Sequence, residues 1–161
     1  MHTKIYWLHT YAHGAKLGIM ARPRGNDWLD TEINNLKKQN VKVLITLLEL
    51  HEVRELGLQQ EEHLCSQYDI TYFNFPIPDR GVPAIGNKTE DLIRSVQQRL
   101  ELGQSIVIHC RMGIGRSSII AGAVMLKTMQ NPKNILFHIS NIRGLSVPDT
   151  AEQTKWLENR H

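Results

Sequence analysis

Runs of apolar residues alternate with amphipathic stretches along the chain, and this alternation predicts strands followed by helices. The longest apolar run covers residues 41–48 and is typical of a strand buried on both faces of a parallel sheet. Residues 105–109 form another apolar run, and residues 71–75 alternate as a strand does. Two shorter β-like runs, 4–9 and 16–21, are joined by a small-residue turn that favours a hairpin. The pattern therefore predicts about five strands.

Polar residues that can cap helices mark the starts of the predicted helices. Asn26 or Asp27 is expected to cap a helix that runs through Gln39, and Thr89 is expected to cap a helix over residues 90–102. Further helices are expected within 51–56 and 60–68, from 116 or 117 to 129, from Pro132 to about residue 142, and after Thr150. Asparagine at 40 and glycine at 57, 103 and 144 are expected to end helices.

Strands that alternate with helices predict an α/β fold. We expect a single domain over residues 1–161, with a mostly parallel central sheet of about five strands and helices on both faces. A chain of 161 residues is long enough for one domain with a full core. Ligands of such sheets collect at the carboxyl ends of the strands. Three segments follow predicted strands, starting at Glu49, Pro76 and Cys110, and we expect them to meet at one edge.

Charge and cysteine content narrow the class of protein. The net charge is +3, from 19 basic and 16 acidic residues, and no block of basic residues predicts a nucleic-acid partner. Cys65 and Cys110 are too few for a disulfide scaffold. No apolar run approaches the roughly 20 residues that span a bilayer, and the first residues lack the apolar segment of a signal peptide. We therefore expect a cytoplasmic protein with reduced thiols, and a monomer.

The chemistry is concentrated in residues 109–118, His-Cys-Arg-Met-Gly-Ile-Gly-Arg-Ser-Ser, between a predicted strand and a predicted helix. A glycine-bearing turn of this kind directs successive backbone N–H groups into one concavity, and the helix adds its positive N-terminal end. The planar guanidinium of Arg116 can hold two phosphate oxygens at once. The segment therefore predicts a phosphate site. The residues expected to bind substrate are Arg111, Met112, Gly113, Ile114, Gly115 and Arg116.

Cys110 is the candidate nucleophile of this site. Nearby positive charge stabilises a thiolate, so the sulfur is expected to be ionised at neutral pH and directed at a bound phosphorus. Ser117 is expected to donate a hydrogen bond to the sulfur, which makes it a better leaving group. We expect His109 to shape the loop through hydrogen bonds to backbone carbonyls and not to act as a base. A buried structural cysteine in an ordinary turn is the alternative, which the complete motif disfavours.

Residues 109–118 resemble the signature loop of the protein tyrosine phosphatase superfamily, and the size of the chain is similar to that of its small dual-specificity members. The resemblance implies hydrolysis of phosphomonoesters without a metal or another cofactor. It also implies two steps, in which the cysteine thiolate forms a cysteinyl-phosphate and water then hydrolyses it. The substrates that it implies are phosphorylated proteins, with phosphotyrosine first and phosphoserine or phosphothreonine in addition.

The two-step mechanism needs a carboxylic acid that protonates the leaving oxygen, and Asp79 is the candidate. It follows a predicted strand, is flanked by prolines, and resembles the Pro-Asp acid loop of the superfamily. Ile77 stands where the tyrosine-specific branch has tryptophan. An ordinary Pro-Asp turn is the alternative.

Supporting roles are expected for carboxylate and amide side chains near the same edge. Glu49 and Glu52 follow the central strand, and either is a candidate to orient Arg116 as a bidentate partner; surface carboxylates are the alternative. Gln153 resembles the glutamine found near the site in some members of the superfamily. It is equally the capping-box partner of Thr150, and both roles are compatible.

The substrate stays open at the level of sequence. Lipid-directed members of the superfamily tend to carry two basic residues inside the loop, whereas here residue 111 is Arg but residue 114 is Ile. A phosphoprotein is therefore favoured over the alternative of a lipid or small-molecule phosphate ester. A non-catalytic phosphate-binding module is disfavoured because Cys110 and Arg116 are both intact. Cys65 and His63 have no second ligand pair with matching spacing, so no metal site is expected.

Overall fold

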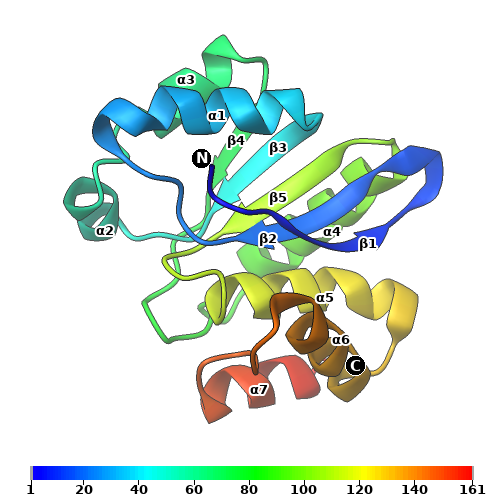
Figure 1. Ribbon diagram of the computed structural model, residues 1–161. Coiled ribbons are helices and arrows are strands. Elements are labelled where there is room, and N and C mark those ends of the chain that lie inside the picture. The colour runs from blue at the N-terminus through cyan, green and yellow to red at the C-terminus, as the bar shows by residue number, and fades with distance from the viewer. Residues whose placement is uncertain (1, 161) are drawn as a thin grey trace.

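The strands form where the sequence has its apolar runs. The computed structural model describes residues 2–160 (Figure 1). The strands are β1 (Tyr6–Thr10), β2 (Lys16–Met20), β3 (Val41–Thr46), β4 (Thr71–Asn74) and β5 (Ser105–His109). They make one five-stranded sheet in the order β1-β2-β5-β3-β4. β1 is antiparallel to β2 and the other pairs are parallel, which confirms the predicted mostly parallel sheet.

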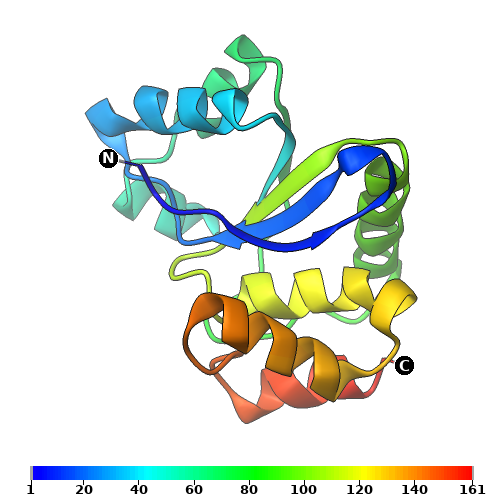
Figure 2. The same ribbon diagram turned by 45° about the vertical axis from the view of Figure 1, so that its right-hand side comes forward.

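Seven α-helices connect and cover these strands. They are α1 (Leu29–Lys38), α2 (Leu50–Glu55), α3 (Glu61–Gln67), α4 (Asn87–Glu101), α5 (Arg116–Met129), α6 (Pro132–Arg143) and α7 (Ala151–Glu158), counted over residues 2–160. Short 3-10 turns cover Ala12–Gly14 and Asn26–Trp28. Figure 2 shows α1 and α3 on one side of the sheet and α4 to α7 on the other. The predicted α/β fold with helices on both faces is therefore confirmed.

Each face of the sheet has its own apolar core. Val107 of β5 points into the cluster under α1 and α3, whereas Ile106 and Ile108 point into the cluster under α4 to α7. Leu44 and Ile45 of β3 divide in the same way. Successive side chains of a strand point to opposite faces, so a central strand covered on both sides has to be apolar throughout. This is the physical reason for the unbroken apolar runs in the sequence.

Helix ends were predicted with mixed success. Asn131 caps α6 by accepting the Lys133 and Asn134 N–H groups on its side chain, and Gly144 ends that helix with a φ of +76°. Thr150 forms the predicted capping box at α7. Each of these caps is formed by residues adjacent in sequence, and a local signal of that kind is visible without the fold.

Two predicted caps are wrong. α1 begins at Leu29, with Trp28 and not Asn26 or Asp27 in the capping position. Asn26 instead starts a 3-10 turn, in which its N–H donates to the Gly57 carbonyl at 2.8 Å.

α4 begins at Asn87, so Thr89 lies inside the helix. Its hydroxyl donates to the Ala84 carbonyl. In both cases the residue makes a hydrogen bond other than the one expected of a helix cap.

Within residues 2–160, no helix combines the length and the hydropathy that crossing a bilayer requires.

Candidate active site

The three segments expected at one edge of the sheet do meet there. The Leu47 N–H donates to the His109 carbonyl at 3.0 Å, and the Ile77 N–H donates to the Leu47 carbonyl at 3.0 Å. These bonds continue the pairing of β5, β3 and β4 beyond the ends of the strands. They place the loop after β5 beside the start of α2 and beside the proline-rich segment.

The backbone carbonyls of the loop after β5 are bound from outside. The Arg111 carbonyl accepts the Arg22 N–H at 3.2 Å. The Met112 and Gly113 carbonyls accept Nη2 and Nε of Arg143, at 3.2 and 2.8 Å. In a trans peptide the N–H points away from the carbonyl of the same unit. The N–H groups that follow these carbonyls are therefore directed toward the inside of the loop, as an anion site requires.

Two glycines allow this loop to pack closely. Gly113 has a φ of +68°, and a Cβ there would lie 2.6 Å from backbone atoms of Met20 and Ala21 at the end of β2. A Cβ on Gly115 would lie 2.8 Å from Oε1 of Gln153. A side chain at either position would push the loop away from the elements that hold it.

Cys110 and Ser117 lie together under the loop. Cys110 is 3% exposed and Ser117 is fully buried in the first turn of α5. Cys110 Sγ and Ser117 Oγ are 3.3 Å apart, within hydrogen-bonding distance when sulfur is a partner. This is the contact expected from the sequence, in which the hydroxyl can donate to a thiolate.

Arg116 is held by a buried carboxylate. Its Nη1 and Nη2 donate to Oε1 and Oε2 of Glu52 at 2.8 and 2.9 Å, and both side chains are at most 2% exposed. Burial raises the pKa of Glu52, but the hydrogen bonds from Arg116 and the Glu49 N–H more than offset it, so that the pKa falls to about 2. Burial lowers the pKa of Arg116, and Glu52 and the other negative groups around it produce a net rise. The guanidinium is thus fixed in place and charged.

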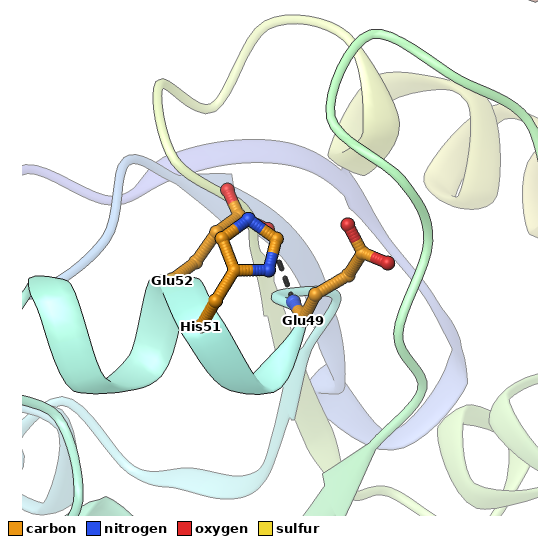
Figure 3. Close-up of side chains that lie close together, drawn as sticks. All are labelled: Glu49, His51 and Glu52. Atoms are coloured by element: carbon orange, nitrogen blue, oxygen red, sulfur yellow. Dashed lines mark hydrogen bonds between the residues drawn. The ribbon is translucent and has the colours of Figure 1, made fainter.

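Of the two glutamates that the sequence offered as partners, Glu52 orients Arg116. Glu49 is the N-cap of α2 and forms a capping box with Glu52. Figure 3 shows these side chains with His51 at the start of the helix, and the dashed line marks the bond from the Glu49 N–H to Glu52. Their ligand atoms lie within 4.8 Å of one another. Because both Glu52 oxygens already accept hydrogen bonds from Arg116, we assign this group to positioning and capping and not to a metal.

Asp79 contacts Arg116 and is itself open to solvent. Its Oδ1 accepts Nη2 of Arg116 at 3.1 Å, while about half of its side chain is exposed (52%). The acid loop, residues 76–83, is attached through Ile77, whose carbonyl accepts Nη1 of Arg116 at 2.9 Å and whose side chain is buried. A carboxyl group is thereby placed next to the arginine that would hold a phosphate, and it is open to solvent.

Gln153 serves both of the roles that the sequence left open. Its Oε1 accepts the Thr150 N–H at 3.2 Å, as in a capping box. Its Nε2 donates to the Gly81 carbonyl at 3.0 Å, which attaches the far end of the acid loop to α7. The Gln153 side chain is fully buried and joins the acid loop to the segment that precedes α7.

His109 contacts a carboxylate that the sequence analysis missed. Its Nδ1 lies 3.3 Å from the Cys110 carbonyl, which is the kind of contact expected. Its Nε2 lies 2.7 Å from Oε2 of Glu61, and both side chains are buried. Tyr72 adds a hydrogen bond to the other oxygen of Glu61. The sequence does hold a signal that Glu61 is buried, because Glu61 and Cys65 are four residues apart and therefore lie on the same side of α3.

Two further arginines contact the loop or belong to it. Arg143, at the end of α6, was also missed, and no local pattern connects it to a segment 30 residues away. Its guanidinium also stacks on the Tyr6 ring, 4.2 Å from the ring centroid. Arg111 was expected to bind substrate, and it forms ion pairs with Glu52 and Glu55.

Comparisons with known proteins agree with this geometry. Residues 18–130 match the family described as "Polymorphic toxin system, DSP-PTPase phosphatase". The chain is 30% identical over 151 residues to cyclin-dependent kinase inhibitor 3 of Rattus norvegicus, with 88% of this chain and 69% of that protein covered. The relative of the same name from Homo sapiens is 28% identical over 151 residues, with the same coverage.

Solved structures show the same fold. Kinase associated phosphatase, with its catalytic-site cysteine substituted by serine, has a TM-score of 0.88 at 21% identity, covering 99% of this chain and 94% of that chain. PTPMT1 in complex with PI(5)P has a TM-score of 0.75 at 20% identity, covering 97% of this chain and 94% of that chain.

Proposed function

Because the chain belongs to the DSP-PTPase phosphatase family and is a cysteine-dependent dual-specificity phosphatase, we propose that it dephosphorylates phosphotyrosine and also phosphoserine or phosphothreonine in proteins. We propose a cysteinyl-phosphate on Cys110 as the intermediate. The observation that carries this proposal is the guanidinium of Arg116, which Glu52 holds in place, which contacts Asp79, and on which the charge of Cys110 also acts.

The first step transfers the phosphoryl group to sulfur. The inward N–H groups and Arg116 bind the phosphate oxygens, which take the place of Asp79 on Nη2 of the guanidinium. The Cys110 thiolate attacks phosphorus, the S–P bond forms, and the bond from phosphorus to the substrate oxygen breaks. The Asp79 carboxylate, released from Arg116 and open to solvent, takes up a proton from water and delivers it to that oxygen, and the alcohol or phenol leaves.

The second step regenerates the free enzyme by hydrolysing the cysteinyl-phosphate. Water attacks the phosphorus of the cysteinyl-phosphate, and the Asp79 carboxylate takes a proton from that water. The S–P bond breaks, and inorganic phosphate leaves. The Ser117 hydroxyl, 3.3 Å from Cys110 Sγ, stabilises the departing thiolate by a hydrogen bond.

A phosphoprotein is the favoured substrate. Two similar proteins, cyclin-dependent kinase inhibitor 3 and kinase associated phosphatase, are named after protein kinases, which points to protein substrates. A lipid phosphate ester is the second candidate. It is supported by Arg111 inside the loop and by the likeness to PTPMT1, whose structure contains PI(5)P.

The test is hydrolysis of 4-nitrophenyl phosphate in excess EDTA, with Cys110→Ser as the matched variant. We expect full activity in EDTA, and a loss of at least about four orders of magnitude in Cys110→Ser with phosphate binding retained. A requirement for added divalent metal, or substantial turnover by the serine variant, would refute the mechanism. A panel of phosphotyrosine, phosphoserine and phosphothreonine peptides and phosphoinositides then ranks the two substrate classes.

A further inference from the structure

The segment 109–118, called here the phosphate loop, holds a second arginine, Arg111, which is bound by the protein itself. Arg111 follows Cys110 directly, so its side chain starts at the edge of the concavity. Its Nε donates to Oε2 of Glu52 at 3.3 Å and its Nη2 donates to Oε2 of Glu55 at 3.0 Å. Both carboxylates come from α2, one turn apart. The polar end of Arg111 is therefore directed at the helix beside the loop.

Charged side chains of both signs make up this cluster. Arg111 and Arg116 each carry a positive charge, Glu52 and Glu55 each carry a negative charge, and Asp79 adds a further negative charge beside Arg116. Glu52 is buried and binds both arginines, so its contribution cannot be separated from the positioning of Arg116. Glu55 differs, because its side chain is 62% exposed and its contact in the cluster is with Arg111. The charge of Glu55 therefore acts on Arg111 without acting directly on Arg116.

We propose that Glu55 is a specificity-determining residue that keeps Arg111 from binding a second phosphate group of a substrate. This inference rests on the proposed function and deepens it, since it selects singly phosphorylated side chains over polyphosphorylated inositol rings. With Nη2 of Arg111 taken by Glu55, the loop offers its inward N–H groups and Arg116 to one phosphate. A second phosphate nearby would meet the Glu55 carboxylate, which repels it.

The experiment removes the carboxylate charge and keeps the shape. In Glu55→Gln, Nη2 of Arg111 loses its ionic partner while Nε stays on Glu52. The readout is the ratio of two inhibition constants against 4-nitrophenyl phosphate hydrolysis, that of inorganic phosphate and that of inositol 1,4,5-trisphosphate. Exposed ion pairs contribute about 0.2–1 kcal/mol, so we expect the ratio to shift about 1.4- to fivefold toward the trisphosphate at low salt. The shift should shrink at high salt, because exposed charges are screened.

Two controls separate Arg111 from a general change of charge. Glu62→Gln removes the same charge from an exposed position on the neighbouring helix α3 and should leave the ratio unchanged. In a double-mutant cycle, Glu55→Gln should no longer shift the ratio of inhibition constants when Arg111→Met is also present.

The outcomes are distinct. An unchanged ratio in Glu55→Gln, an equal shift in Glu62→Gln, or a shift that persists without Arg111 would each overturn the inference. If the unmodified chain does not hydrolyse 4-nitrophenyl phosphate at all, the proposed function is refuted instead.

Discussion

The phosphate loop and the acid loop lie side by side, but they are built in opposite ways. In the phosphate loop, Cys110, Arg116 and Ser117 are at most 3% exposed, and carbonyls of the loop are bound by residues of other elements. In the acid loop, the reactive side chain of Asp79 is about half exposed, and attachment is through Ile77 and Gly81 at its two ends. The proposed phosphate site is thus part of the core, whereas the proposed proton donor lies at the surface.

This difference predicts at which residues a substitution changes both the stability of the fold and the activity. A change in the phosphate loop or its buried partners alters the core, so it should reduce both the free energy of unfolding and the activity. A change at Asp79 should reduce activity alone. The predictions below test this division, beginning with the largest expected effect.

Glu52→Gln should have the largest effect on stability. The substitution leaves the buried Arg116 guanidinium without its buried carboxylate partner, and such a loss lowers the free energy of unfolding by about 3–5 kcal/mol. Urea unfolding measures it. Glu49→Gln is the matched control, because it removes a carboxylate charge beside Glu52 while its amide oxygen can still accept the N–H at the start of α2, so it should lower stability by less than about 1 kcal/mol. Equal stability of the two variants would contradict the assignment of Glu52 to Arg116.

Asp79→Asn should lower kcat by about 10²–10³-fold for phenyl phosphate, whose leaving group needs a proton. The loss should be much smaller for 4-nitrophenyl phosphate, because nitrophenolate leaves without protonation. The free energy of unfolding should change by less than about 1 kcal/mol, since the ion pair with Arg116 is half exposed. Steady-state kinetics with both substrates measures the contrast. Equal losses for the two leaving groups would exclude Asp79 as the acid.

Acid should remove the stability that Glu52 provides. The pKa of Glu52 in the folded chain is about 2, below the ordinary glutamate value of about 4.5. Its contribution is therefore present above about pH 4.5 and is lost as the pH falls toward 2, on the order of 3 kcal/mol in total. Unfolding measured between pH 6 and pH 2 should show the difference between wild type and Glu52→Gln shrinking in this range. A constant difference would contradict the lowered pKa.

Arg143→Met should have the smallest of these effects. The variant loses the donors to the Met112 and Gly113 carbonyls, so the inward N–H groups are less well oriented. We expect the inhibition constants of phosphate and vanadate to rise about tenfold, in line with the loss of about 1.4 kcal/mol from hydrogen bonds by a charged group. KM should rise more than kcat falls.

Arg160→Met is the control for Arg143. Arg160 lies just after α7, and its guanidinium pairs with Glu90 of α4 and not with the phosphate loop. Its replacement should leave both inhibition constants unchanged. Arg143→Lys should restore part of the affinity, because one donor can still reach a carbonyl. If Arg143→Met binds phosphate as tightly as wild type, Arg143 has no positioning role.

The predictable parts of the molecule are those encoded by neighbours in sequence. The apolar runs of β3 and β5 predicted central strands, because a strand covered on both faces leaves no position for a polar side chain. The Cys110 loop was equally visible, since its cysteine, glycines and Arg116 lie within a few residues of one another. The caps at Asn26 and Thr89 were predicted wrongly, because these residues make other contacts, the Asn26 N–H with the Gly57 carbonyl and the Thr89 hydroxyl with the Ala84 carbonyl.

The sequence by itself determined the α/β fold and the spacing of Cys110 and Arg116, because hydrophobic period and loop geometry are properties of short segments. Only the tertiary structure chose Glu52 over Glu49, joined Glu61 to His109, and brought Arg143 to the phosphate loop. These contacts join residues 30 to 64 positions apart. Such pairs depend on which side chains the folded core brings together, and a buried charge is stable only where its partner is also buried.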